Sequence, residues 1–225
     1  MEPIPKSRSF VRRWVLATLG GWLLGIVVVG LLGDALEGIG VGGQFPIALG
    51  VGLVVGYAQW LVARKWFAAS RRWIWASAIG MTAPFLIADI VAIRWRAWST
   101  ADNATSLLLA VALGGALTGW WQRRCLQPRS GRGRMWAVAS GGGWALAAVV
   151  TLFAMVPGHP ESALDMWRNL GALPLGGAVM GAVTVVGLVW VLKAEGTESP
   201  AAGDAVGGLP DSHGSSGFGD RPEGE

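Results

Sequence analysis

One acidic residue lies well inside an apolar stretch of this 225-residue chain. Asp89 falls within a predicted membrane-spanning helix over residues 73–93, and the corresponding positions of the other recurring units hold Gly30 and Leu152. A carboxylate inside a bilayer is costly, and such residues commonly carry protons or cations. Arg94 follows little more than one helical turn later, so pairing with its guanidinium is the structural alternative. Both interpretations of Asp89 stay open.

A second set of polar residues recurs near the ends of three predicted helices. Gln59, Gln122 and Thr184 each follow a pair of glycines, at a similar distance from the end of an apolar run. Matching their depths to the preceding helices predicts three pairs, which are Gln59 with Thr18, Gln122 with Ser77 and Thr184 with Ser140. Such a layer would hold helices together through hydrogen bonds. Alternatively, it would line a narrow path on a pseudo-threefold axis along the membrane normal.

The chain lacks the residue sets on which common enzymes depend. A nucleophilic Ser140 would need a nearby base, but the two histidines, His159 and His213, lie outside the predicted spans. The single cysteine, Cys125, excludes an intramolecular disulfide and a cysteine-based zinc cluster. The sequence contains no H-E-x-x-H motif and no phosphate-binding glycine loop with its lysine. We therefore expect no enzymatic activity, no metal site and no cofactor.

Glycine pairs spaced four residues apart recur on the predicted helices. Small residues at this spacing share one helix face and let a neighbouring backbone approach closely. The glycines expected to pack helices together are Gly21, Gly25, Gly52, Gly56, Gly115, Gly119, Gly177 and Gly181. Because Gly52 and Gly56 lie on the second helix of a hairpin, the predicted partner is the first helix of the same hairpin.

These residues must be positioned by membrane-spanning helices, because the composition is that of a membrane protein. Hydrophobic residues make up 52% of the chain and charged residues only 14%, whereas soluble domains carry about 25% charged residues. Apolar runs of about 20 residues are long enough to cross a bilayer. The predicted spans are residues 14–33, 45–63, 73–93, 104–121, 136–156 and 171–192. We expect an all-α integral membrane protein with six transmembrane helices in three hairpins.

The same pattern sets the predicted domain organisation. Residues 1–13 form a basic N-terminus, and residues 14–193 form the six-helix domain. Its three repeats cover about 12–66, 71–127 and 134–193. Residues 194–225 hold seven acids, one base and many Gly, Ser and Pro residues, which predicts a disordered tail. Prolines are expected near the starts of the second and sixth helices, at Pro46 and Pro174, and inside the third, at Pro84.

The basic residues predict the orientation in the membrane. Fifteen of the 18 Lys and Arg residues lie in residues 1–13, 64–72 and 122–135 or after residue 192. Because Lys and Arg are retained on the cytoplasmic side, both termini are expected to be cytoplasmic. The tryptophans that open three helices, Trp14, Trp73 and Trp136, are expected at the headgroup level of that side. Since the bases flank apolar runs, the net charge of +4 does not indicate nucleic-acid binding.

The recurring units share a pattern of Trp-x-x-Ala-Ser/Thr on one helix and Gly-x-x-x-Gly-x-x-Gln-Trp on the next. The three copies are Trp14 to Trp22 with Gly52 to Arg64, Trp73 to Gly80 with Gly115 to Arg124, and Trp136 to Trp144 with Gly177 to Thr184. This pattern, over residues 12–190, resembles a group of uncharacterised bacterial multi-pass membrane proteins. Arg123 replaces the pattern's tryptophan in the second copy, and Thr184 replaces its glutamine in the third. The resemblance implies a bacterial inner membrane and no particular activity.

Two classes of function follow from these residues. The favoured class is a non-enzymatic scaffold or accessory protein that binds the lipid bilayer and another membrane protein or itself. The alternative is a transporter or channel for a small solute or ion, with Asp89 or the layer of Gln59, Gln122 and Thr184 in its path. Transporters usually need several intramembrane ionisable residues, and this chain offers one.

Overall fold

Six long helices account for most of the described chain. The computed structural model describes residues 8–37, 43–95, 104–126, 133–154 and 162–195. The helices are α1 (Arg8–Glu37), α2 (Phe45–Phe67), α3 (Arg72–Trp95), α4 (Ala104–Gln122), α5 (Gly133–Ala154) and α6 (Ala163–Glu195), with a short 3₁₀ helix η1 (Arg123–Cys125) after α4. All six are long and apolar enough to cross a membrane. The chain is therefore a multi-pass, all-α membrane protein, as the composition predicts.

The predicted boundaries are close for the four middle helices and too short for α1 and α6. Helix α6 begins at Ala163, eight residues before the predicted start, so Pro174 lies inside the helix and not at its beginning. A capping motif explains the early start, because Ser162 Oγ accepts a hydrogen bond from the backbone N–H of Asp165 at 3.1 Å. Pro46 does lie in the first turn of α2. The predicted tail begins within the last turn of α6, and its residues after 195 lie outside the described part of the chain.

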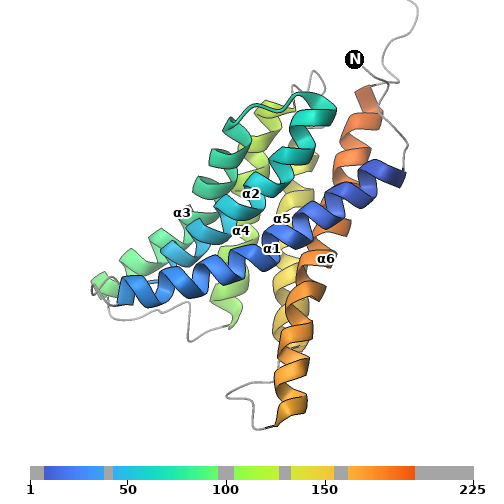
Figure 1. The fold of residues 1–225 in the computed structure, drawn as a ribbon. Coiled ribbons are helices and arrows are strands. Elements are labelled where there is room, and N and C mark those ends of the chain that lie inside the picture. Colours follow the sequence, from blue (N-terminus) through green and yellow to red (C-terminus); the bar gives the residue numbers. More distant parts are fainter. Residues whose placement is uncertain (1–7, 38–42, 96–103, 127–132, 155–161, 196–225) are drawn as a thin grey trace, which may run out of the picture.

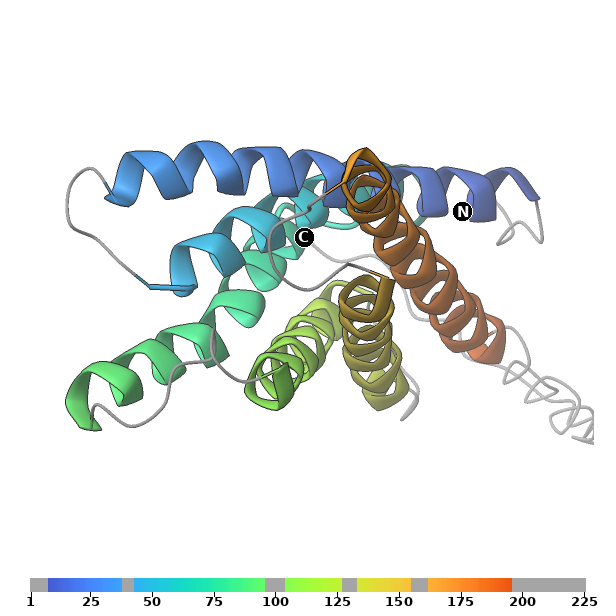
Figure 2. The same cartoon turned by 90° about the horizontal axis from the view of Figure 1, so that it is seen from below.

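The helices form a closed ring in chain order. Each helix packs extensively against the helices before and after it in the chain, and α1 packs against α6. Figures 1 and 2 show this arrangement, with α6 lying between α1 and α5. The three hairpins α1–α2, α3–α4 and α5–α6 therefore follow one another around the ring, and each contacts both of the others.

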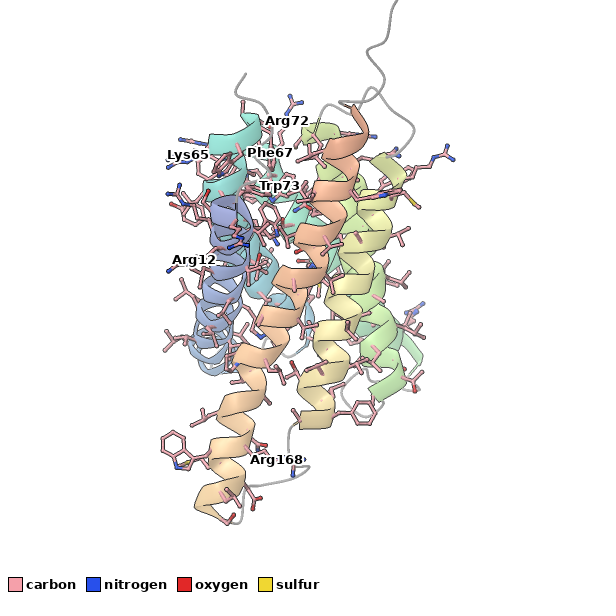
Figure 3. All side chains as sticks on the ribbon, turned by 90° about the vertical axis from the view of Figure 1, so that its right-hand side faces the viewer. Arg12, Lys65, Phe67, Arg72, Trp73 and Arg168 are labelled. Carbon is pink, nitrogen blue, oxygen red and sulfur yellow. The ribbon has the colours of Figure 1, made fainter. Side chains whose placement is uncertain are left out.

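The two ends of the ring differ in charge and in helix length. Figure 3 shows Lys65 and Arg72 near one end, called the basic end below, Arg12 farther from that end than Lys65, and Arg168 near the opposite end. The first turns of α6 extend past the other helices at the end opposite the basic end (Figures 1 and 3). There the Arg168 Nε donates to the carbonyl of Ala154 at 3.0 Å, which satisfies an acceptor in the last turn of α5.

Large apolar side chains cover the outside of the ring. Leu16, Val27, Ile87, Phe153 and Val186 are among the residues with 52–80% of their surface exposed. An exposed apolar surface of this extent is unfavourable in water and favourable against lipid chains. The packed interior consists of two clusters, one toward the basic end around Trp14 and one around Trp144 and Met180.

Candidate functional site: the polar layer at the basic end

Three tryptophans meet at the centre of the ring near its basic end. Trp14, Trp73 and Trp136 lie in the first two turns of α1, α3 and α5, and no more than 1% of the surface of each is exposed. The ring centroids lie 6.0 Å apart for Trp14 and Trp73, 5.9 Å for Trp73 and Trp136, and 6.3 Å for Trp14 and Trp136. These indoles do not face lipid headgroups as interfacial anchors would, because all three are buried at the centre of the bundle.

Two of the three indoles donate hydrogen bonds to the predicted polar layer. Trp136 Nε1 donates to Gln122 Oε1 at 3.1 Å, and Trp14 Nε1 donates to Thr184 Oγ1 at 3.0 Å. Each acceptor lies on the helix that precedes the tryptophan's own helix around the ring. The Nε1 of Trp73 is buried and has no hydrogen-bond partner among the described residues. The tryptophans and the polar layer thus form one packed unit.

The amide groups of this unit bond within the hairpins. Gln59 Nε2 donates to Thr18 Oγ1 at 3.3 Å, and Gln122 Nε2 donates to Ser77 Oγ at 2.8 Å. These are two of the three predicted pairs. The third prediction, Thr184 with Ser140, is wrong. A threonine is shorter than a glutamine, and its hydroxyl donates to the Met180 carbonyl of its own helix at 2.7 Å.

The polar layer is almost completely buried. Gln59, Gln122 and Thr184 have 4%, 1% and 1% of their surface exposed, respectively. Two helical turns from the tryptophan triangle, Trp22 and Trp144 continue the filled centre with their ring centroids 5.6 Å apart. In water-free surroundings a satisfied hydrogen-bond network fixes the geometry of the groups that form it. These hydrogen bonds join α1 to α2 and to α6, and α4 to α3 and to α5, and they hold those helices in register at the basic end.

The glycine pairs of α2, α4 and α6 lie between hairpins, not within them. A Cβ atom on Gly52 would lie 2.8 Å from the Ser77 carbonyl oxygen of α3, and one on Gly56 would overlap the Ser77 side chain. In the same way Gly115 and Gly119 face α5, and Gly177 and Gly181 face α1. The prediction that Gly52 and Gly56 face α1 is wrong, because a helix in a ring has two neighbours and the pair faces the one in the next hairpin.

Glycines of α1 make the contact within the first hairpin. A Cβ atom on Gly21 would lie 2.9 Å from the Ala58 Cβ, and one on Gly25 would lie 3.3 Å from the Val51 Cα. Both neighbours belong to α2. Close packing of backbones is thus present on both sides of the ring helices, as expected where lipid supplies no hydrophobic drive for helix association.

Asp89 satisfies the beginning of α2. Its Oδ2 accepts hydrogen bonds from the backbone N–H groups of Gln44 at 2.7 Å and Phe45 at 2.8 Å. The prediction that Asp89 pairs with Arg94 is wrong. The two backbone N–H groups donate to the carboxylate in place of a guanidinium, and the helix dipole favours a negative charge at this helix N-terminus. Gly43 makes the approach possible, since its φ is +135° and a Cβ atom there would lie 2.8 Å from Asp89 Oδ2. Asp89 is therefore a cap provided by a neighbouring helix.

The described residues contain no group of three or more His, Cys, Asp or Glu that could hold a metal ion. Comparison with known proteins does not assign the site either, since no protein-family model, curated protein or solved structure matches the chain.

Sequence reasoning missed the contact among Trp14, Trp73 and Trp136. A signal was present in the sequence, because Trp14, Trp73 and Trp136 occupy corresponding positions of the three recurring units. A tryptophan that anchors a helix at the membrane surface does not need a fixed position, whereas a tryptophan that packs at a shared centre does.

Proposed function

We propose that this protein is a non-enzymatic membrane scaffold or accessory protein that binds another membrane protein or a second copy of itself. One observation carries the proposal. The polar residues that a transport path would use are engaged in internal hydrogen bonds: Gln59, Gln122 and Thr184 in the packed layer, and Asp89 at the start of α2. What remains for interaction is the outer surface of the ring.

We further propose that the protein resides in the cytoplasmic membrane of a bacterium, with both termini in the cytoplasm. The basic bias supports the orientation, because 15 of the 18 Lys and Arg residues belong to segments on the side of the termini. We also propose that the three hairpins are repeats of one unit. The tryptophan contacts and the glycine contacts, which recur from one hairpin to the next around the ring, support this view.

Crosslinking in the native membrane tests the proposed function. An affinity-tagged chain, lightly crosslinked and then purified, should bring down a stoichiometric membrane protein or a second differently tagged copy. The Gln59→Leu and Asp89→Asn variants should restore whatever a gene deletion loses, because neither side chain would be part of a path. A folded Asp89→Asn protein that fails to restore the phenotype, together with solute-dependent thermal stabilisation of the wild type, would support transport instead.

A further inference from the structure

An apolar groove runs along the outside of the first hairpin. It lies between α1 and α2, and its volume is about 480 Å³. The groove exists because short residues form its floor, namely Ala17, Gly20 and Gly21 on α1 and Ala58 on α2. Its walls are large apolar side chains, including Leu24 and Leu61. The volume falls within the range of about 300–1,000 Å³ that is typical of ligand sites.

Two positive charges stand at one end of this groove. Arg13 and Lys65 line it at the basic end of the bundle, and both residues are exposed. Neither forms an ion pair with an acid in the part of the chain that the structure describes. The neighbouring Arg64 is engaged elsewhere, since its guanidinium lies 4.8 Å from the centroid of the Trp60 ring. Arg13 and Lys65 are thus the basic groups that a ligand in the groove would meet.

The groove is long enough to hold a large part of one acyl chain. It extends along α1 from Arg13 to Leu24, which is about 16 Å at 1.5 Å per residue. Half of a hydrocarbon core is about 15 Å thick. Because α1 is inclined to α4 and α5 (Figures 1 and 2), the groove spans less than this depth, and an acyl chain in it stays within the leaflet on the side of the basic end.

We propose that this groove binds one anionic phospholipid, with an acyl chain between α1 and α2 and the phosphate between Arg13 and Lys65. Charge complementarity selects this occupant, because basic groups between helices at the headgroup level attract anionic headgroups. A second copy docked groove to groove would bring the same positive charges together, since a twofold interface pairs a surface with itself. A zwitterionic lipid carries its own cation next to the phosphate, so it would compensate the two basic groups less than an anionic lipid does.

The groove belongs to the first hairpin and not to the general design of the ring. At the corresponding positions of the second hairpin, Ile79 stands in place of Gly20 and Trp121 in place of Ala58. These larger side chains would fill the floor of an equivalent groove. In the third hairpin Gly142 corresponds to Gly20, but Met135 stands in place of Arg13 and Trp190 in place of Lys65, so both cations are absent. The proposed site therefore needs residues that only the first hairpin combines.

Native mass spectrometry of the detergent-purified protein tests the site. The probes are phosphatidylglycerol and phosphatidylcholine with identical acyl chains, titrated into the same preparation. We expect one phosphatidylglycerol to be retained in preference to phosphatidylcholine. Gly20→Leu should abolish this preference, because a leucine fills the floor of the groove. It should do so without unfolding the protein, since a Cβ atom at Gly20 meets nothing within 4 Å.

A matched control exists on α5. Gly142 is also exposed, and a Cβ atom there also meets nothing within 4 Å. Gly142→Leu should keep both the size-exclusion profile and the preference for phosphatidylglycerol. Equal loss of lipid in the Gly20→Leu and Gly142→Leu proteins would overturn the proposal, and so would equal retention of the two lipids by the wild type.

Charge variants test the headgroup contact separately from the groove. Arg13→Gln and Lys65→Gln should each weaken phosphatidylglycerol binding about fivefold, which corresponds to about 1 kcal/mol, and should leave phosphatidylcholine binding unchanged. Arg72→Gln is the control, because Arg72 corresponds to Arg13 in the second hairpin and does not line the groove. If Arg72→Gln weakened phosphatidylglycerol binding equally, the preference would be explained by the general positive charge of the surface and not by the groove. A dimer that Gly20→Leu dissociates, with no lipid retained, would assign the groove to a second copy and overturn the proposal.

Discussion

Trp73 differs from its two partners in the tryptophan triangle by one missing hydrogen bond. Trp14 and Trp136 donate to Thr184 and Gln122, whereas Trp73 Nε1 has no partner among the described residues. The residue that corresponds to Gln122 in the first hairpin is Gln59, and its amide donates only a long bond of 3.3 Å to Thr18. Gln59 and Gln122 therefore occupy corresponding positions but contribute differently to the stability of the protein, and this difference can be measured.

Gln122→Leu should destabilise the protein more than Gln59→Leu. The first change removes the bond to Ser77 and strands the buried N–H of Trp136, and an unpaired buried donor costs about 1–3 kcal/mol. The second change removes one interhelical bond, worth about 0.6–2 kcal/mol in a membrane. The midpoint of thermal aggregation in detergent, followed by size-exclusion chromatography, measures both. If Gln59→Leu proves the more damaging, the glutamine layer has a role beyond packing.

Asp89→Asn should be tolerated and Asp89→Leu should not. An asparagine keeps an oxygen that can accept from the backbone N–H groups of Gln44 and Phe45, and it loses only the charge interaction with the helix dipole, about 0.3–1 kcal/mol. A leucine strands both N–H groups, at about 1–3 kcal/mol each. The amount of protein accumulated in the membrane and its thermal stability in detergent report the difference. Equal behaviour of the two variants would contradict the capping role.

At the scale of the helices, the sequence predicts the position of each helix better than it predicts which helices pack against each other. The apolar runs locate all six helices, and the polar residues near their ends locate two of the three hydrogen-bonded pairs. The start of α6 could not be predicted from apolar content, because the first turns of that helix extend past the other helices and are fixed by the Ser162 cap. The partner of Gly52 and Gly56 could not be predicted either. A helix face is visible in the sequence, but the neighbour it meets is decided by closure of the ring.

Gly56→Leu should be strongly destabilising because it acts between two hairpins. A Cβ atom at Gly56 would already overlap Ser77 of α3, and overpacking of a close contact costs about 1–3 kcal/mol or more. Gly119→Leu and Gly181→Leu should act likewise, since both glycines face the next hairpin. Gly30→Leu is the control, because a Cβ atom there meets nothing within 4 Å. The readout is thermal aggregation in detergent, and a loss of stability in Gly30→Leu equal to that in Gly56→Leu would contradict the packing argument.

At the scale of the whole molecule, the proposed orientation makes the connections at the two ends of the ring chemically distinguishable. Single cysteines in a Cys125→Ser background should react with an impermeant thiol reagent from outside when placed in residues 34–44, 97–102 or 158–169. Cysteines in residues 64–72 or after residue 194 should react only after the membrane is permeabilised, which also serves as the positive control. Labelling of residues 64–72 in intact cells would contradict the orientation.

The contact between α1 and α6 gives the chain no true first or last hairpin. The α2–α3 connection and the two ends of the helical domain lie at the same end of the bundle (Figure 1), so a circular permutant could begin at α3 and rejoin α6 to α1 through a short linker. Such a protein should insert and show the same thermal stability, because every neighbour in the ring is kept.

The contact of α6 with α1, which closes the ring, also suggests a route by which the architecture arose. On the proposal that the three hairpins are repeats of one unit, a single hairpin whose second helix packs on the first helix of the next copy would form a cyclic homotrimer, and gene triplication would then join the three copies.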